Sequence, residues 1–471
     1  RAGAADAIMG VATAREVVRA IQSRGTPARD VMVVITDGEE AGLLGANAFF
    51  RRDPLSARVG FVINMEARGG GGRVQMFQTS PKNGELIRAF ARTAARPAAS
   101  SLTGLIYEKM PNDTDLTESL RAGVAGMNYA IIGRQFDYHS ATSTPNNLER
   151  GALQDMGTQV LAMANEIAFA TDLPNRTKSV VYANLFGDTV VVYSQTFGWA
   201  LLVATALLLA YAVRWARHAG EFAAQDILRG MGALVFLGLG TVAVLQFARR
   251  LTGVDFGFLE QRFLLAQTNR WEWGVMLLSL GVMLISAAAL SRTRRWVTAL
   301  PIVAGLGCTA FSFPQIDWIG VVTGVLGTGV GLLIYGKPVN RKGAWAGILT
   351  LGWILTALLQ IIAPAAAYVL AWPLLVLTAA FVLWPLAQPD PGRSPSRYIG
   401  ILVLTAGFGI TAIIRSADPW TPRYPMATYV GYQIDQDAGR AWRFGLAGDN
   451  TAWTDTVLRA DGGAKAPREH W

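Results

Sequence analysis

The sequence predicts an α/β domain, then a membrane domain made only of helices, then the start of a β-rich segment. In roughly the first 170 residues, short apolar runs rich in β-branched residues alternate with helical patterns. This alternation is typical of a mostly parallel central sheet flanked by helices. The 471 residues are 52% hydrophobic and only 16% charged, a bias beyond that of an ordinary soluble enzyme. It comes from apolar segments after about residue 188, so we expect domains over 1–175, 188–415 and 416–471.

Three strands are expected in the N-terminal domain. The runs that predict them are 31–36, 59–65 and 127–132. Helical patterns cover 10–22 and 41–52. In folds of this class, ligands gather outside the carboxyl ends of the strands. We therefore expect functional side chains to lie where these three runs end.

Two adjacent carboxylates follow the first of these runs, in Asp37-Gly38-Glu39-Glu40. A purely structural interpretation is that Asp37 caps the helix that follows and that both glutamates favour its positive end. A functional interpretation is that one carboxylate binds a metal ion while the other takes a proton from water. Groups at the other strand ends shift the balance toward the functional interpretation.

Three further groups occupy comparable positions in the pattern. Asp6 lies just before the helical pattern of 10–22, Glu66 follows the second run, and His139 follows the third. An oxygen-rich set with one imidazole suits zinc and related divalent ions. Together with Glu39 and Glu40, these groups predict a divalent metal site at the strand ends.

Four motifs, taken in order, resemble the M28 family of zinc peptidases. They are Gly3-Ala4-Ala5-Asp6, Thr36-Asp37-Gly38-Glu39-Glu40, Asn64-Met65-Glu66 and Tyr138-His139-Ser140. More narrowly, they resemble the membrane-bound branch that includes the endoplasmic reticulum metallopeptidases and their bacterial relatives. The resemblance covers about residues 1–170 and the general layout of a membrane region behind them.

The resemblance implies a site with two zinc ions. Asp6 would bridge them, Glu40 would bind one, and Glu66 and His139 would bind the other. Glu39 would be the general base that takes a proton from a zinc-activated water. The implied function is a membrane-anchored metallopeptidase that hydrolyses peptides. Aminopeptidase is the expected mode, because that activity is common in the family.

The chain departs from the family pattern at one zinc ligand. The family has a further histidine, in a His-x-Asp motif upstream of the bridging aspartate, whereas this chain begins five residues before Asp6. We therefore expect a fragment whose N-terminal part is missing. Since zinc sites normally have three or four protein ligands, this chain is expected to bind one zinc ion well and to be weakly active.

Two other functions stay open at this point. One is a membrane receptor or scaffold that keeps the peptidase fold as a binding module. The missing histidine favours it, as does Ala7, where the family usually has an acidic or amide residue, but a scaffold has no need of Glu39 as a base. The other is an acyltransferase with a single zinc ion, like the glutaminyl cyclases. The number of bound zinc ions distinguishes this last function from a two-zinc peptidase.

Eight apolar segments predict membrane helices. They are 190–213, 231–247, 273–291, 297–313, 318–335, 344–362, 366–386 and 398–414. Transporters usually need ionisable side chains within their membrane helices, and none of these segments carries one near its middle. We therefore expect a bundle that anchors the protein in a lipid bilayer. The formal net charge of +9 lies mostly in short loops between these segments rather than on one face, which argues against nucleic acid as a partner.

Charge placement predicts the orientation. Lys and Arg follow the first, third, fifth and seventh segments, so these loops are expected in the cytoplasm. The loop 248–272 is an exception with four arginines, which we discount because it is longer and also acidic. The N-terminal domain and the tail after Arg415 are then both non-cytoplasmic. High Ala, Gly and Arg content indicates a GC-rich bacterium, and so an inner-membrane protein with its peptidase domain in the periplasm.

The C-terminal segment turns polar and Trp-rich after Pro419. A strand is expected over 429–434, with turns at 435–439 and 448–450. This pattern predicts the start of a second, β-rich domain outside the cytoplasm, cut off at Trp471.

Overall fold

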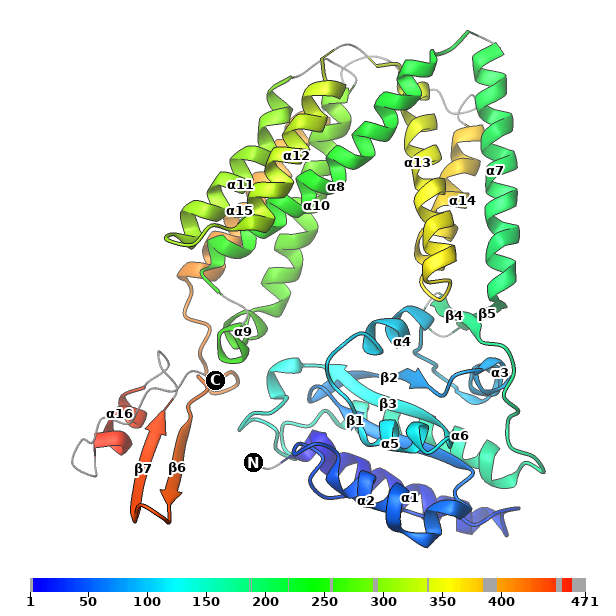
Figure 1. Cartoon of the computed structure of the whole chain (residues 1–471), viewed down its shortest axis with the longest axis vertical. Coiled ribbons are helices and arrows are strands. Elements are labelled where there is room, and N and C mark those ends of the chain that lie inside the picture. Colours follow the sequence, from blue (N-terminus) through cyan, green and yellow to red (C-terminus); the bar gives the residue numbers. More distant parts are fainter. Residues whose placement is uncertain are drawn as a thin grey trace.

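The computed structural model describes residues 3–185, 187, 189–218, 220–254, 257–290, 295–336, 339–383, 396–445 and 451–459. An N-terminal α/β domain, a long helical bundle and a small C-terminal hairpin follow one another along the chain (Figure 1). The α/β domain and the hairpin lie at the same end of the bundle. This arrangement agrees with an even number of membrane helices between them.

The N-terminal domain is built on a three-stranded sheet in the order β1-β3-β2. β1 (Phe61–Ala67) and β3 (Ala125–Gly133) run parallel, while β2 (Gly71–Thr79) pairs with β3 in the antiparallel direction. The sheet is therefore mixed rather than mostly parallel. The reason is the glycine-rich turn before β2, which reverses the chain in a space too small for side chains: a Cβ at Gly69 would collide with the carbonyl oxygen of Gly133.

The run 31–36, expected as a strand, is not one. Its apolar side chains are exposed, Ile35 by 68%, and within residues 3–185 no backbone hydrogen bond joins the run to another segment. A strand needs partners for its N–H and C=O groups. Here the run lines a cavity of about 830 Å³ that the edge strand β1 also lines. The other two expected strands are confirmed, because β1 and β3 pair with each other.

The two expected helices of this domain are confirmed as α1 (Met9–Arg24) and α2 (Leu44–Arg52), although α2 begins later than expected. Four more helices complete the domain: α3 (Gly84–Thr93), α4 (Ser101–Tyr107), α5 (Asp115–Arg121) and α6 (Arg150–Phe169). Short helical turns occupy Ala4–Ile8, Pro54–Arg58 and Gln135–Asp137.

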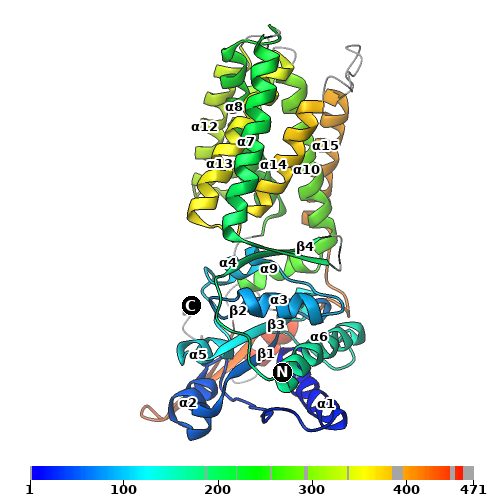
Figure 2. The same cartoon turned by 90° about the vertical axis from the view of Figure 1, so that its right-hand side faces the viewer.

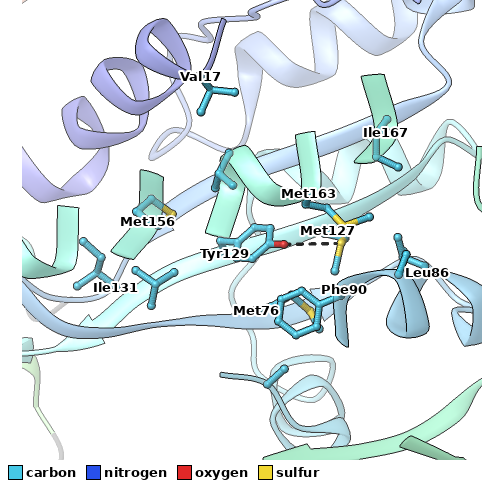
Figure 3. Packing of buried hydrophobic residues seen from close by; sticks show 14 of the residues in the cluster. Val17, Met76, Leu86, Phe90, Met127, Tyr129, Ile131, Met156, Met163 and Ile167 are labelled. Atoms are coloured by element: carbon cyan, nitrogen blue, oxygen red, sulfur yellow. Dashed lines mark hydrogen bonds between the residues drawn. The ribbon is translucent and has the colours of Figure 1, made fainter. Parts of the chain in front are cut away.

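Alternation along β3 sends successive side chains to opposite faces of the sheet. Tyr129 points into the main core, where its ring lies 6.2 Å from that of Phe90 on α3 (Figure 3). Ala130 points to the other face, which borders a cleft. In the parallel register Glu66 of β1 stands opposite Ala130, so it also faces the cleft rather than the core.

All eight expected membrane segments are helical within the described residues. They are α7 (Gln195–His218), α8 (Ala224–Thr252), α10 (Thr268–Leu290), α11 (Ala299–Ser312), α12 (Trp318–Ile334), α13 (Arg341–Ile362), α14 (Tyr368–Leu383) and α15 (Ser396–Ser416). Five of them, α7, α8, α10, α13 and α15, are long and apolar enough to cross a membrane, and the other three are shorter apolar helices. A short helical turn, Arg295–Thr298, precedes α11.

Two connections bring the bundle and the N-terminal domain together. The hairpin of β4 (Val180–Leu185) and β5 (Thr189–Ser194) leads directly into α7 (Figure 2). The short helix α9 (Phe258–Leu265) lies in the connection from α8 to α10, between the bundle and the N-terminal domain (Figure 1). The membrane region therefore contacts the N-terminal domain through α9 as well as through the covalent link at the β4–β5 hairpin.

The C-terminal segment contains a hairpin and one helix among the described residues. β6 (Val430–Asp435) and β7 (Arg440–Gly445) pair in the antiparallel direction, and α16 (Ala452–Arg459) follows. The expected strand at 429–434 and the turn at 435–439 are confirmed by this hairpin. The expected turn at 448–450 lies outside the described residues.

Candidate active site

Asp6, Glu40 and His139 come together at the cleft although they are far apart in the sequence. The Nε2 atom of His139 lies 3.2 Å from a carboxylate oxygen of Asp6 and 2.5 Å from one of Glu40. One ligand atom from each residue can be chosen so that all three lie within 4.8 Å of one another. Side chains this close can share one cation, since each offers an atom to the same ion.

Glu39 and Glu40 lie in a turn rather than in a helix. α2 begins only at Leu44 and has no side-chain cap, because the Asp37 carboxylate accepts a hydrogen bond from the N–H of its neighbour Gly38 at 2.7 Å. The expectation that Asp37 caps the helix is therefore wrong. The turn instead places both glutamates at the cleft, with Glu39 half-buried and Glu40 exposed.

The half-buried position of Glu39 changes its acidity. Burial, together with the nearby carboxylates of Glu40, Asp6 and Asp115, raises the pKa of Glu39 to about 7. A carboxyl group with a pKa near neutrality can both take and return a proton at physiological pH. This is the property that a general base in hydrolysis needs.

Glu66 lines the same cleft but lies outside the three-residue cluster. The side-chain amide of Asn64, two residues earlier on β1, donates a hydrogen bond to Glu66 at 2.8 Å. Burial is the main effect that raises the pKa of Glu66 to about 8; the charges of Asp6 and Glu39 add to it and the Asn64 hydrogen bond opposes it. Without a cation nearby, Glu66 is therefore mostly protonated at neutral pH.

The backbone and neighbours of His139 hold its ring in one orientation. His139 has a φ of 49°, in the left-handed region that residues other than glycine rarely adopt. Its ring stacks on Tyr138, with 3.8 Å between centroids and 16° between planes, and the guanidinium of Arg68 lies 5.1 Å from the centre of the Tyr138 ring. Burial raises the pKa of Tyr138 to about 12, so its hydroxyl stays protonated at neutral pH.

The cleft at this site has a volume of about 620 Å³. Asp6, Glu39, Glu40 and Glu66 line it on one side, and apolar side chains line it as well: Phe77, Ile106, Tyr107 and Met110. A cleft of this size, with a few polar groups among apolar walls, is typical of a site for a small molecule or a short peptide segment.

Two further residues of the site were not among the sequence candidates. Asn64 lies on the same face of β1 as Glu66, and the period-two alternation of the strand could have indicated it. Asp115, the first residue of α5, accepts a hydrogen bond from the hydroxyl of Thr36, and its charge raises the pKa values of Glu39 and Glu66. No motif marks Asp115, because only the fold brings α5 to the turn after 31–36.

The donor set fits a divalent cation. Carboxylate oxygens with one imidazole nitrogen are ligands that zinc accepts. Neighbouring carboxylates contribute to the raised pKa values of Glu39 and Glu66, and a bound cation would remove this repulsion. The arrangement can therefore hold a metal ion next to a carboxyl group that is able to exchange a proton.

Comparison with known proteins agrees with this chemistry. Residues 1–164 match the family model described as Peptidase family M28. Endoplasmic reticulum metallopeptidase 1 of Mus musculus is 26% identical over 266 residues, which are 53% of this chain and 30% of the mouse protein. Its counterpart in Homo sapiens is 25% identical over 266 residues, 53% of this chain and 29% of that protein.

A fungal protein gives a similar result. The vacuolar membrane protease of Leptosphaeria maculans is 26% identical over 228 residues, which are 46% of this chain and 28% of the fungal protein. In all three relatives the matched region spans less than a third of the length of the relative. No solved structure matches the chain.

Proposed function

Because the N-terminal domain of this chain belongs to peptidase family M28, we propose that the protein is a membrane-bound zinc metallopeptidase that acts as an aminopeptidase. One observation carries the proposal: His139 contacts both Asp6 and Glu40, with Glu39 at the same cleft. The five long apolar helices support the membrane location.

In this proposal, four side chains hold zinc. Asp6 would hold both ions, Glu40 one of them, and Glu66 and His139 the other. The close approach of Asp6, Glu40 and His139 supports a shared metal site, and Glu66 lines the same cleft. When bound, zinc polarises the carbonyl of the scissile peptide bond and lowers the pKa of water.

Glu39 carries the proton in the proposed reaction. It takes a proton from the attacking water and returns it to the nitrogen of the leaving amine. Burial is the main cause that raises the pKa of Glu39, to about 7 in the metal-free site, and it favours proton exchange by this carboxyl group near neutral pH. Tyr138 holds the ring of His139 by stacking, and Asn64 orients the carboxyl group of Glu66.

The charge of the cleft supports an aminopeptidase mode. Acidic side chains outnumber basic ones among the residues that line it, and those that hold no zinc can pair with the positively charged amino terminus of a peptide. The apolar wall that includes Phe77 and Tyr107 would accept an apolar side chain of the substrate. The proposed substrate is therefore a peptide with a free amino terminus.

We also propose that the peptidase domain lies outside the cytoplasm, in the periplasm of a bacterium. The domain, the α9 connection and the C-terminal hairpin share one end of the bundle, and the charge pattern of the loops supports a cytoplasmic position for the other end. Cysteine labelling of the intact cell would test this: a cysteine introduced at exposed Glu16 should react with an impermeant reagent.

A second candidate function is an acyltransferase with a single zinc ion. The observation that favours it is the cluster itself, in which three donors lie close together while Glu66 lies outside the set. The receptor or scaffold is less favoured, because the environment that brings the pKa of Glu39 near neutrality has no use in a pure binding module.

One experiment distinguishes these functions. The full chain is incubated with paired peptides that differ only in an acetylated amino terminus, with and without a zinc chelator, and products are followed by mass spectrometry. Stepwise loss of N-terminal residues from the free peptides alone, blocked by the chelator, supports the aminopeptidase. Loss of ammonia from N-terminal glutamine with no cleavage supports the acyltransferase. Zinc-independent binding without any product supports the scaffold.

A further inference from the structure

Arg262 is a buried arginine that connects the membrane region to the peptidase domain. It lies on α9 and is only 2% exposed. Its Nη2 donates to the carbonyl oxygen of Phe136 at 2.7 Å, and its Nη1 donates to that of Tyr138 at 3.3 Å. The guanidinium also lies 4.1 Å from the centre of the Phe136 ring. Because a buried charge is costly without such partners, the contact is a specific one.

The two carbonyl groups flank Asp137, and a second arginine, from the segment that follows α15, contacts the carboxylate of Asp137. Asp137 is 1% exposed, and Arg423, in the segment after α15, donates to its Oδ2 at 2.9 Å. Arg134 pairs with the same carboxylate at 3.0 Å, and the hydroxyl of Thr142 donates to its other oxygen at 2.7 Å. The loop 134–142 is therefore held from its own domain, from α9 of the membrane region and from the segment that follows α15.

This loop carries His139, whose position depends on its neighbours. The left-handed conformation is unfavourable for a residue other than glycine, so the surroundings must hold His139 in it. The ring of His139 stacks on Tyr138, and the carbonyl group of Tyr138 is the one that Arg262 binds. The contact of Arg262 thus acts on the peptide unit that joins Tyr138 to His139.

We propose that Arg262, with Arg423, is a positioning residue for His139, so that the membrane region completes the peptidase site in addition to anchoring it. The inference rests on the proposed function, because it assigns these residues a role toward a zinc ligand. The proposal also explains why the loop 248–272 contains Arg262. The charge pattern of the other loops puts this loop outside the cytoplasm, where arginine is not expected. Arg262 binds the peptidase domain rather than the membrane surface.

Four variants of the full chain in detergent micelles test the proposal. Arg262→Met keeps an unbranched side chain but removes the charge and the hydrogen bonds, and Arg262→Lys keeps the charge and one donor group. Arg250→Met is the matched control, because Arg250 pairs at 2.6 Å with Asp317, which belongs to the bundle. Arg423→Met provides a second test of the same loop if Arg262→Met does not fold.

The first measurement is the visible absorption of bound cobalt, which replaces zinc and reports its ligand geometry. Loss of a partner behind a metal ligand typically weakens metal binding about 10- to 100-fold, and we expect this loss for Arg262→Met and for Arg423→Met. Arg262→Lys should recover part of it, and Arg250→Met should match the parent. Equal cobalt affinity and an equal spectrum in the parent and in folded Arg262→Met would overturn the proposal.

The second measurement is hydrogen exchange in the loop 134–142, which needs neither metal nor activity. Faster exchange there in Arg262→Met than in Arg250→Met is expected, and unchanged exchange would overturn the proposal. If the parent binds no cobalt and cleaves no peptide, the proposed function fails, while the exchange result still decides whether the membrane region holds this loop.

Discussion

His139 and Glu40 are in direct contact, with 2.5 Å between Nε2 of the imidazole and Oε1 of the carboxylate. Glu40 comes from the turn before α2, and His139 comes from the loop after β3. Their contact therefore depends on the fold of the whole domain rather than on any local motif. It makes these two residues the most direct points at which the proposed metal site can be tested.

His139→Ala is expected to lower the zinc content of the purified protein. An imidazole that binds the ion directly should matter more than an outer partner, whose loss costs about 10- to 100-fold in affinity. Metal analysis after dialysis measures the effect. His218→Ala, at the end of α7, is the matched control and should retain zinc. Equal zinc in the His139 variant and the parent would remove His139 from the ligand set.

Glu39→Gln is expected to abolish most turnover while zinc content stays unchanged. The amide cannot take a proton, and positioned acid–base groups contribute about 10²- to 10⁴-fold to the rate. Steady-state kinetics should show the loss in kcat rather than in KM. Glu16→Gln, an exposed site on α1 that pairs with Arg19 at 2.8 Å, is the matched control. A parent-like kcat in the Glu39 variant would exclude its role as the base.

Zinc binding is expected to strengthen as the pH rises toward 8 and to release protons. The pKa of Glu66 is raised from its ordinary value of 4.5 to about 8, so below that pH zinc must displace a proton from it. In the metal-free protein the same shift stabilises the fold below pH 4.5, and this contribution is lost as the pH rises through about 8. Calorimetry in buffers with different ionisation enthalpies counts the protons. Zinc binding to Glu66→Gln should release fewer protons than zinc binding to the parent. Equal proton release would contradict the assignment of Glu66 as a zinc ligand.

Asn64→Leu is expected to weaken zinc binding at pH 7. The Asn64 amide lowers the pKa of Glu66 by donating to it, so its loss leaves Glu66 more often protonated and less well oriented. The expected loss in affinity is about 10- to 100-fold. Asn47→Leu is the matched control, because Asn47 donates in the same way to Glu118, away from the cleft. A parent-like affinity for Asn64→Leu would show that Glu66 needs no such partner.

The membrane helices were readable from the sequence because their pattern is local. A long apolar run has to form a helix in a bilayer, since no water is there to bind its backbone groups. All eight expected segments are helical over the residues that the structure describes. The run 31–36 shows the opposite case: its β-branched residues favour a strand, yet a strand needs a backbone partner, and within residues 3–185 no backbone hydrogen bond joins the run to another segment.

The sequence by itself determined the order of the parts and the candidate residues Asp6, Glu39, Glu40, Glu66 and His139. These depend on composition, periodicity and the succession of motifs, which are properties of short stretches. The tertiary structure alone decided that His139 lies between Asp6 and Glu40, that Glu66 stays apart from that cluster, and that the sheet is mixed. It also decided that Arg262 reaches the loop of His139, because contacts between distant segments follow from packing and backbone hydrogen bonds that no local pattern encodes.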